Sequence, residues 1–144
     1  MLMSTLIKKS TAEELERFGP MIKVIISNPE NSSEEYEGLA LVDTGGTRSQ
    51  IEASYFDKLK PQRLNLVVAN NSSIQGAIKE TYKVHLKFPE LNKEGDFEVT
   101  FATMTATKAN RADAVITVLG RDFLSKCKFT YMGTGEYQIE LLSN

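Results

Sequence analysis

Residues 39–46 read LALVDTGG, an apolar run that leads directly into Asp43, Thr44 and two glycines. An aspartate at the buried end of a strand loses hydration, so its charge needs hydrogen bonds from the protein. Gly45 and Gly46 let the backbone turn tightly enough for amide groups to approach the carboxylate. We therefore interpret Asp43 as a candidate functional residue. The alternative interpretation is an ordinary turn, because Asp often precedes Gly in turns.

The segments around this stretch have the pattern of short strands separated by turns. Residues 21–27 and 36–42 are apolar strand-like runs on either side of the polar segment 28–35, which predicts a β-hairpin with a polar loop. Residues 52–59 have helix-compatible spacing, and Pro61 ends that helix. A short helix is thus expected between strands.

A second and longer hairpin is predicted where the runs 64–69 and 78–88 flank the polar residues 70–76, whose tip we expect to be exposed and mobile. The rest of the chain continues in the same manner. An alternating run, a nearly continuous apolar run, a brief helical turn and a final hairpin are predicted at residues 97–105, 114–119, 123–124, and 128–131 with 137–142. This succession has no βαβ rhythm and predicts an all-β closed sheet.

The N-terminal residues differ from this pattern. Residues 10–14 carry two overlapping capping-box patterns, and Leu15 and Phe18 add a short apolar stripe before Gly19. We expect residues 1–19 to form an N-terminal arm or a short helix, and residues 20–144 to form a single domain, since 144 residues are typical of one domain.

Composition excludes several classes of protein. Hydrophobic residues make up 41% and charged residues 25%, as in soluble globular proteins, and the net charge of -2 gives no broad positive field for nucleic acid. Cys127 is the single cysteine, so an internal disulfide and a four-thiolate zinc site are excluded. The sequence has no run typical of a signal peptide or a membrane-spanning helix. We expect a cytoplasmic protein that has no membrane partner.

His85 is the single histidine, which excludes mechanisms that need two. It lies in an alternating run and shares a face with Lys83 and Lys87, which favours a structural or solvated role. Cys127 and His85 fall in separate predicted strands with no evident third partner, so we set a cysteine protease aside. The sequence also has no Gly-Lys loop that would hold a phosphate.

Three features occur in a fixed order: LVDTGGTRSQI at residues 41–51, then the long hairpin, then VLGRDFL at residues 118–124. In this order they resemble the retropepsin-like aspartic proteases, the single-domain relatives of pepsin found in retroviruses, in eukaryotic DNA-damage-inducible proteins and in many bacterial genomes. The resemblance runs from Met21 to Leu142. It implies a closed, retropepsin-like all-β barrel with one or two short helices and an active site at a homodimer interface.

The resemblance also implies residue roles. Asp43 resembles the catalytic aspartate, and Thr44 resembles the threonine whose hydroxyl locks two active-site loops across the dimer. Gly45 keeps the turn tight, and Gly46 stands where the family usually has Ala or Ser. Two further groups are implied, a pocket floor and a substrate-covering flap. The floor is Val118, Leu119 and Gly120, and the flap is Ser72, Ser73, Ile74, Gln75 and Gly76.

The chain contains one Asp-Thr-Gly, whereas this chemistry needs two carboxyl groups. Two carboxyls about 3 Å apart share a proton, so one acts as a base toward water and the other donates to the scissile carbonyl. A twofold homodimer brings two copies of Asp43 together. The resemblance therefore implies an aspartic endopeptidase that acts on a peptide or protein substrate and requires no metal or organic cofactor.

Two alternatives remain open at this point. The first is a catalytically silent member of the same fold that binds peptides or has a regulatory role. The second is a β-barrel that binds nucleic acid or a small ligand, but the basic residues are scattered and no aromatic stacking pair is evident.

Overall fold

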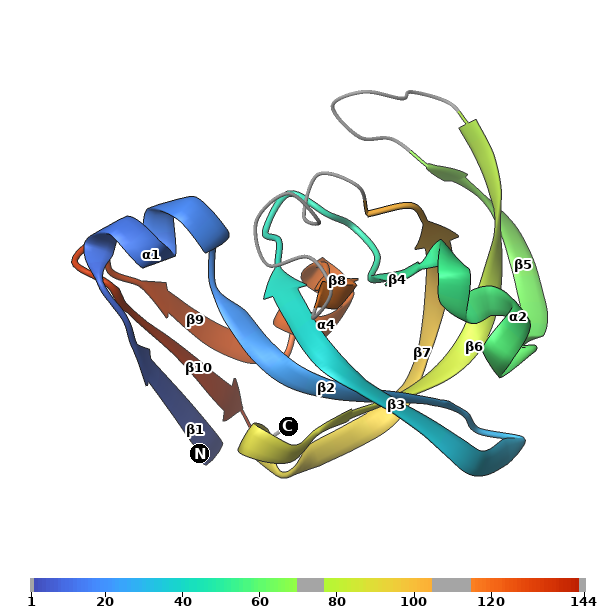
Figure 1. Ribbon diagram of the computed structural model, residues 1–144, viewed down its shortest axis with the longest axis horizontal. Helices are drawn as coiled ribbons and strands as arrows, with labels where there is room; N and C mark the ends of the chain where they lie inside the picture. Colours follow the sequence, from blue (N-terminus) through green and yellow to red (C-terminus); the bar gives the residue numbers. More distant parts are fainter. Residues whose placement is uncertain (1, 70–76, 105–114, 143–144) are drawn as a thin grey trace.

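The computed structural model describes residues 2–69, 77–104 and 115–142 of the chain. Their strands form a seven-stranded sheet and a separate three-stranded sheet (Figure 1). The strands are β1 (Leu2–Lys9), β2 (Met21–Asn28), β3 (Asn31–Val42), β4 (Gln50–Glu52), β5 (Gln62–Ala69), β6 (Ala77–Phe88), β7 (Lys93–Ala102), β8 (Val115–Leu119), β9 (Cys127–Tyr131) and β10 (Glu136–Leu142). The helices are α1 (Ala12–Phe18), α2 (Phe56–Leu59) and α4 (Arg121–Leu124), and single 3₁₀ turns lie at η1 (Ala53–Tyr55) and η2 (Pro89–Leu91).

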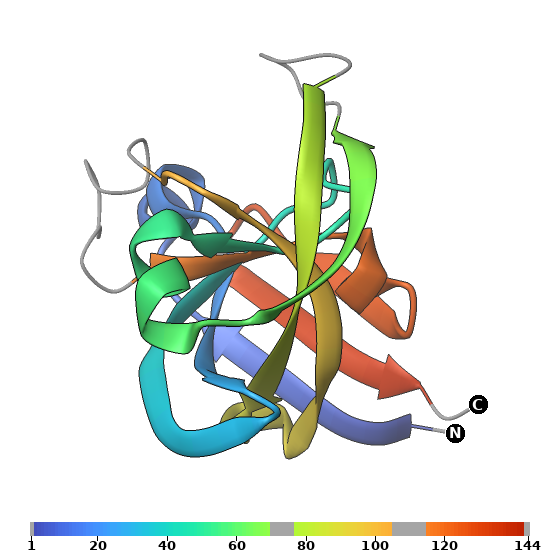
Figure 2. The same ribbon diagram turned by 90° about the vertical axis from the view of Figure 1, so that its right-hand side faces the viewer.

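The larger sheet closes into a barrel, as the sequence predicted. Its strand order is β2-β3-β8-β4-β7-β6-β5, and an additional pairing of β2 with β6 joins the first strand to the sixth. Alternate side chains of these two strands point into the barrel. Val24 and Ile26 on β2 and Val84 and Leu86 on β6 are all fully buried. The closing pairs join residues 25–27 to residues 85–87, so the two strands have no unpaired edge over those residues. Among the described strands β5 pairs with β6 alone, so the two form a hairpin that projects beyond the barrel (Figure 2).

The three-stranded sheet joins the two ends of the described chain. Strand β10 lies between β1 and β9, and Ile139 on β10 faces Leu6 on one side and Phe129 on the other. The final hairpin was predicted from the sequence, whereas strand β1 was not. Lys8 and Lys9 obscure the apolar pattern of this segment. Its strand partner is β10, which lies more than 120 positions away.

Helix α1 follows β1 and begins as the capping pattern predicted. The Thr11 hydroxyl accepts a hydrogen bond from the Glu14 amide at 3.0 Å, which satisfies one free donor of the first turn. Leu15 is buried, and the helix ends at Gly19, whose φ of 77° favours glycine.

The first hairpin differs from its prediction in one respect. Strand β3 already begins at Asn31, and Asn28 pairs with Asn31, so the polar loop is much shorter than residues 28–35. A register shift between Ser27 and Asn28 makes this end of the β2–β3 pairing irregular, and the polar residues lie in that exposed end. The remaining predicted strands and short helices are present, and the tip of the second hairpin, residues 70–76, lies outside the described residues.

Among the residues that the structure describes, no helix is both long and apolar enough to cross a membrane.

Tyr137 connects the three-stranded sheet to the barrel, and its removal tests that connection. Its buried hydroxyl donates to the Met21 carbonyl and accepts from the Met21 amide at 3.1 Å. In Tyr137→Phe both backbone groups lose this partner, so we expect the free energy of unfolding to fall by about 1–3 kcal/mol in urea titrations. Tyr131→Phe on neighbouring β9 is the control, because the Tyr131 side chain is half exposed, and its stability should be unchanged. Equal stabilities of the two variants would contradict the connection.

Candidate active site

Asp43 lies immediately after β3, at the start of a tight loop. Its amide donates to the Leu119 carbonyl at 2.8 Å, and its own carbonyl accepts from the Gly46 amide at 3.2 Å. The Gly45 amide donates to the Asp43 carboxylate at 2.9 Å. The two glycines thus allow the close approach of amide and carboxylate that the sequence predicted. In the single chain the Asp43 side chain is exposed and accessible to a reactant.

The carboxyl ends of two parallel strands determine where Asp43 lies. Strands β3 and β8 run parallel, with Leu41 beside Val118 and Val42 beside Leu119. Val42 and Leu119 are buried, and the Val42 amide donates to the Pro20 carbonyl at 2.9 Å. Asp43 therefore emerges at the carboxyl end of a strand whose last residues are fixed in the core.

Gly120 contacts the backbone of the loop that follows Asp43. The Arg121 amide donates to the Gly46 carbonyl at 2.8 Å. A Cβ atom on Gly120 would lie 2.8 Å from the Gly46 carbonyl oxygen and 2.9 Å from the Arg48 carbonyl carbon. Real side chains do not approach backbone atoms so closely, so the contact requires glycine. The structure thus brings Asp43, Gly46 and Gly120 together, although Gly120 follows Asp43 by 77 positions.

The far end of the loop is fixed by a hydrogen-bond network around Asp122. The Asp122 carboxylate accepts from the Ser49 amide at 2.9 Å, from the Ser49 hydroxyl at 2.7 Å and from the Phe123 amide at 2.9 Å. The fully buried Ser49 hydroxyl accepts in turn from the Gly120 amide at 3.1 Å. The sequence did not predict the pairing of Ser49 with Asp122, because nothing local connects the two positions.

Arg121 was also missed. Its guanidinium donates to the Thr44 carbonyl at 3.0 Å and to the Thr47 hydroxyl at 3.1 Å. A planar guanidinium presents several donors in fixed directions, so one side chain fixes two points of the loop. The sequence signal that could have identified Arg121 is the Gly-Arg-Asp triplet at residues 120–122, since all three residues contact the loop that follows Asp43.

The other residues selected from the sequence lie in different places. Thr44 is exposed, and its hydroxyl has no hydrogen-bond partner among the described residues of the single chain. On β8, Val118 is half-buried and Leu119 is fully buried beneath the loop. The flap residues lie outside the part of the chain that the structure describes: Ser72, Ser73, Ile74, Gln75 and Gly76.

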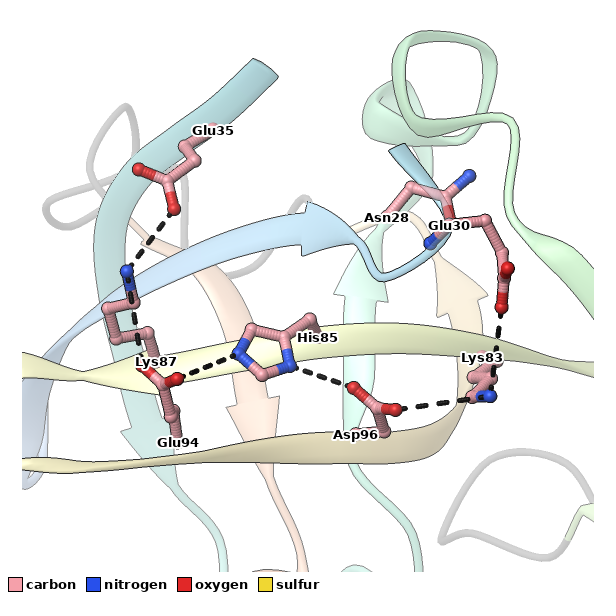
Figure 3. Close-up of polar contacts among 8 residues, drawn as sticks. All are labelled: Asn28, Glu30, Glu35, Lys83, His85, Lys87, Glu94 and Asp96. Carbon is pink, nitrogen blue, oxygen red and sulfur yellow. Dashed lines mark hydrogen bonds and ion pairs between the residues drawn. The ribbon is translucent and has the colours of Figure 1, made fainter. Parts of the chain in front are cut away.

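Cys127 and His85 lie on other elements. Cys127 is on β9, and burial raises the pKa of its thiol to about 11, so the nucleophilic thiolate is scarce at neutral pH. His85 is on β6, where its Nδ1 lies 2.7 Å from Asp96 and its Nε2 lies 3.8 Å from Glu94 (Figure 3). Lys83 and Lys87 flank it on the same face, which is the arrangement that alternation predicted. His85 thus belongs to a network of surface charges.

No cluster of three or more His, Cys, Asp and Glu side chains suited to a metal ion occurs within the described ranges.

The chain is similar to known proteins in sequence and in fold. The sequence matches the family described as retroviral aspartyl protease over residues 17–131. A retropepsin-like aspartic protease from Rickettsia conorii superposes with a TM-score of 0.54 at 14% identity, covering 97% of this chain and 92% of that chain. The EIAV protease in complex with the inhibitor HBY-793 gives a TM-score of 0.39 at 20% identity, covering 74% of this chain and 85% of that one.

A third solved structure is the retroviral protease-like domain of Ddi1 from Leishmania major. It gives a TM-score of 0.39 at 13% identity, covering 76% of this chain and 79% of that chain. Comparison with curated protein sequences gave no match. The Rickettsia structure supports the fold, and the family match covers the loop and both strands that carry it.

Asp122→Asn tests the network that fixes the loop. An amide in place of the carboxylate keeps one acceptor oxygen but turns an NH₂ group toward the Ser49 amide, so one charge-assisted bond is lost. We expect the free energy of unfolding to fall by about 1.5–3 kcal/mol in urea titrations. Asp57→Asn on the exposed surface of α2 is the matched control and should leave stability unchanged. A wild-type stability for Asp122→Asn would show that this network does not hold the loop.

Proposed function

The chain belongs to the retroviral aspartyl protease family, and on that premise we propose that it is an aspartic endopeptidase whose water molecule is activated between the Asp43 carboxylates of two identical subunits. The observation that carries the proposal is the position of Asp43. Its carboxylate is exposed, receives an amide hydrogen bond from Gly45 and stands on a loop held by β8. Support from the distant strand β8 fixes the loop, and a catalytic carboxylate needs such a fixed position.

The proposed reaction is a hydrolysis that needs two carboxyl groups in different protonation states. The ionised group takes a proton from water, and the hydroxide equivalent adds to the scissile carbonyl carbon. The protonated group donates to the carbonyl oxygen. The first carboxyl then passes the proton it took from water to the leaving nitrogen, the second carboxylate takes back a hydroxyl proton, and collapse of the tetrahedral intermediate releases the amine and the new carboxylic acid. Two neighbouring carboxyls share one proton because both cannot ionise at small separation. The chemistry requires no metal ion and no organic cofactor.

The remaining site residues have supporting roles in this proposal. The Thr44 hydroxyl, which has no partner among the described residues, is available to bond the partner subunit's loop. Gly45 and Gly46 keep the turn tight, and Arg121 fixes the loop through the Thr44 carbonyl. The floor of the site is Val118, Leu119 and Gly120, and the flap that covers the substrate includes Ser72, Ser73, Ile74, Gln75 and Gly76.

We further propose that residues 20–144 form the protease domain, that residues 1–19 serve it as an arm, and that the homodimer cleaves peptides or proteins in the cytoplasm. The pairing of β1 with β10 supports an arm that is attached to the domain. The net charge of -2 gives no support to a nucleic-acid partner.

The homodimer is testable in solution. One Asp-Thr-Gly per chain means that a single chain lacks half of the catalytic pair. Sedimentation at micromolar concentration should give a mass near twice 16.1 kDa. A protein that remains a strict monomer at high concentration and still cleaves peptides would exclude the shared pair.

Asp43→Asn tests the catalytic role directly. The substitution keeps the size of the side chain but removes the ionisable group from both halves of the site, so turnover of an unfolded protein substrate should fall by a factor on the order of 10⁴. Thermal stability should hold or rise slightly, because repulsion between two carboxylates is removed. Asp57→Asn is the matched control and should cleave like the wild type.

Two results of that experiment would contradict the proposal. Full activity of a folded, dimeric Asp43→Asn would place the proteolysis elsewhere. A wild-type dimer that cleaves nothing between mildly acidic and neutral pH, yet binds the same unfolded protein, would identify a catalytically silent peptide-binding module.

A further inference from the structure

A cavity of about 330 Å³ lies on the barrel between the N-terminal half of β7 and the segment that carries α4. Its lining does not include Asp43. The lining includes Arg48 from the active-site loop, Phe123 and Lys126 from the α4 segment, and Leu141 from β10. In Figure 2 this part of β7, in gold, lies beside the orange and red elements near the C-terminus. The cavity is therefore separate from the proposed catalytic pair.

Strand β7 has a free edge along this cavity. Strand β6 pairs with residues 93–99 of β7 on one side, but β4 pairs on the other side only with residues 100–102. On that second side the Glu98 carbonyl accepts from Arg48 at 3.4 Å and the Thr100 amide donates to Ser49 at 3.3 Å. Because backbone direction alternates along a strand, the amide and carbonyl groups of Glu94 and Asp96 also face that side.

No group among the described residues forms a hydrogen bond with those outward backbone groups of Glu94 and Asp96. An unpaired strand edge is a template on which an extended peptide adds as a further strand. The edge therefore selects for an extended polypeptide over a compact small molecule.

The wall next to this edge is aromatic and has room for a side chain. Phe88 packs against Phe97 and Phe123, with ring centroids 6.2 and 4.8 Å away. Gly95 lies in the middle of the edge, and a Cβ atom on it would meet nothing within 4 Å. The aromatic wall and the empty space favour a large apolar side chain.

The charged side chains that line the cavity are four carboxylates, Glu94, Asp96, Glu98 and Asp122, and three cations, Arg48, Lys93 and Lys126. The lining carboxylates are engaged, since Glu98 bonds Thr81 and Asn65, and Asp122 bonds Ser49. Glu94 and Asp96 take part in the network around His85 (Figure 3).

Lys93 and Lys126, by contrast, are exposed, and no carboxylate of the described residues lies within ion-pair distance of either. An acidic side chain on the ligand complements these two lysines.

We propose that this cavity is an exosite, a second binding site outside the catalytic pair, for an extended segment of a partner polypeptide. The segment pairs with the free edge of β7 at Glu94 and Asp96. It places a large apolar side chain beside Gly95 and an acidic side chain beside Lys93 or Lys126. The inference goes beyond the proposed proteolysis and does not depend on it, because binding at this edge needs no catalytic carboxylate.

The test measures binding of an end-blocked, fluorescein-labelled peptide, Glu-Thr-Phe-Thr-Phe-Thr-Glu, by anisotropy. The full-length Asp43→Asn protein is used, so that the peptide is not cleaved. We expect saturable binding that weakens roughly tenfold or more when Gly95→Leu fills the cavity. Gly133→Leu is the matched control, because Gly133 also has open space around its Cβ position but lies in the β9–β10 turn, and its affinity should be unchanged.

Two further measurements distinguish strand addition and charge recognition from nonspecific binding. The same peptide methylated at all its inner amides should not bind, because it cannot pair with the edge. The double change Lys93→Glu with Lys126→Glu should weaken the acidic peptide, and replacement of both Glu residues of the peptide by Lys should restore its affinity. Equal binding to the Gly95→Leu and Gly133→Leu proteins, equal binding of the methylated peptide, or no effect of the charge reversal would each overturn the exosite.

Discussion

The site depends on one contact between two stretches of backbone, in which the Gly46 carbonyl accepts from the Arg121 amide while the α-carbon of Gly120 presses against the same loop. No side chain fits between them. The contact is possible because β3 and β8 run parallel in the core and deliver Asp43 and Gly120 side by side. The direction of the Asp43 carboxylate is thus determined by the packing of two strands as much as by its own turn.

The rest of the fold serves this arrangement at both ends of the loop. Closure of the barrel through β2 and β6 buries the strands on which the loop stands, and Tyr137 joins the terminal sheet to the Met21 backbone at the start of β2. Asp122 and Ser49 then tie the loop's far end to α4. The loop is consequently supported by the core, the terminal sheet and a short helix together, whereas its exposed face has no neighbour among the described residues.

Sequence reasoning succeeded where the signal was local and failed where it was distant. The strands of the hairpins, the buried β8 and the tight turn after Asp43 follow from alternation and turn residues. Three features depend on partners 70 or more positions away, which no local pattern specifies. They are strand β1, the Ser49–Asp122 hydrogen bonds and the hydrogen bonds of the Arg121 guanidinium. Gly95 lies outside the strands predicted from the sequence and was given no role there, and only the structure shows the empty space beside it.

The parallel pairing of β3 with β8 also has a consequence during synthesis. Gly120 is added 77 residues after Asp43, and chains grow at roughly 5–20 residues per second, so several seconds pass before the loop's support exists. Until then the nascent chain on the ribosome contains Asp43 but lacks β8 and Gly120, which support its loop. The order of translation therefore delays assembly of the loop until most of the barrel has been made.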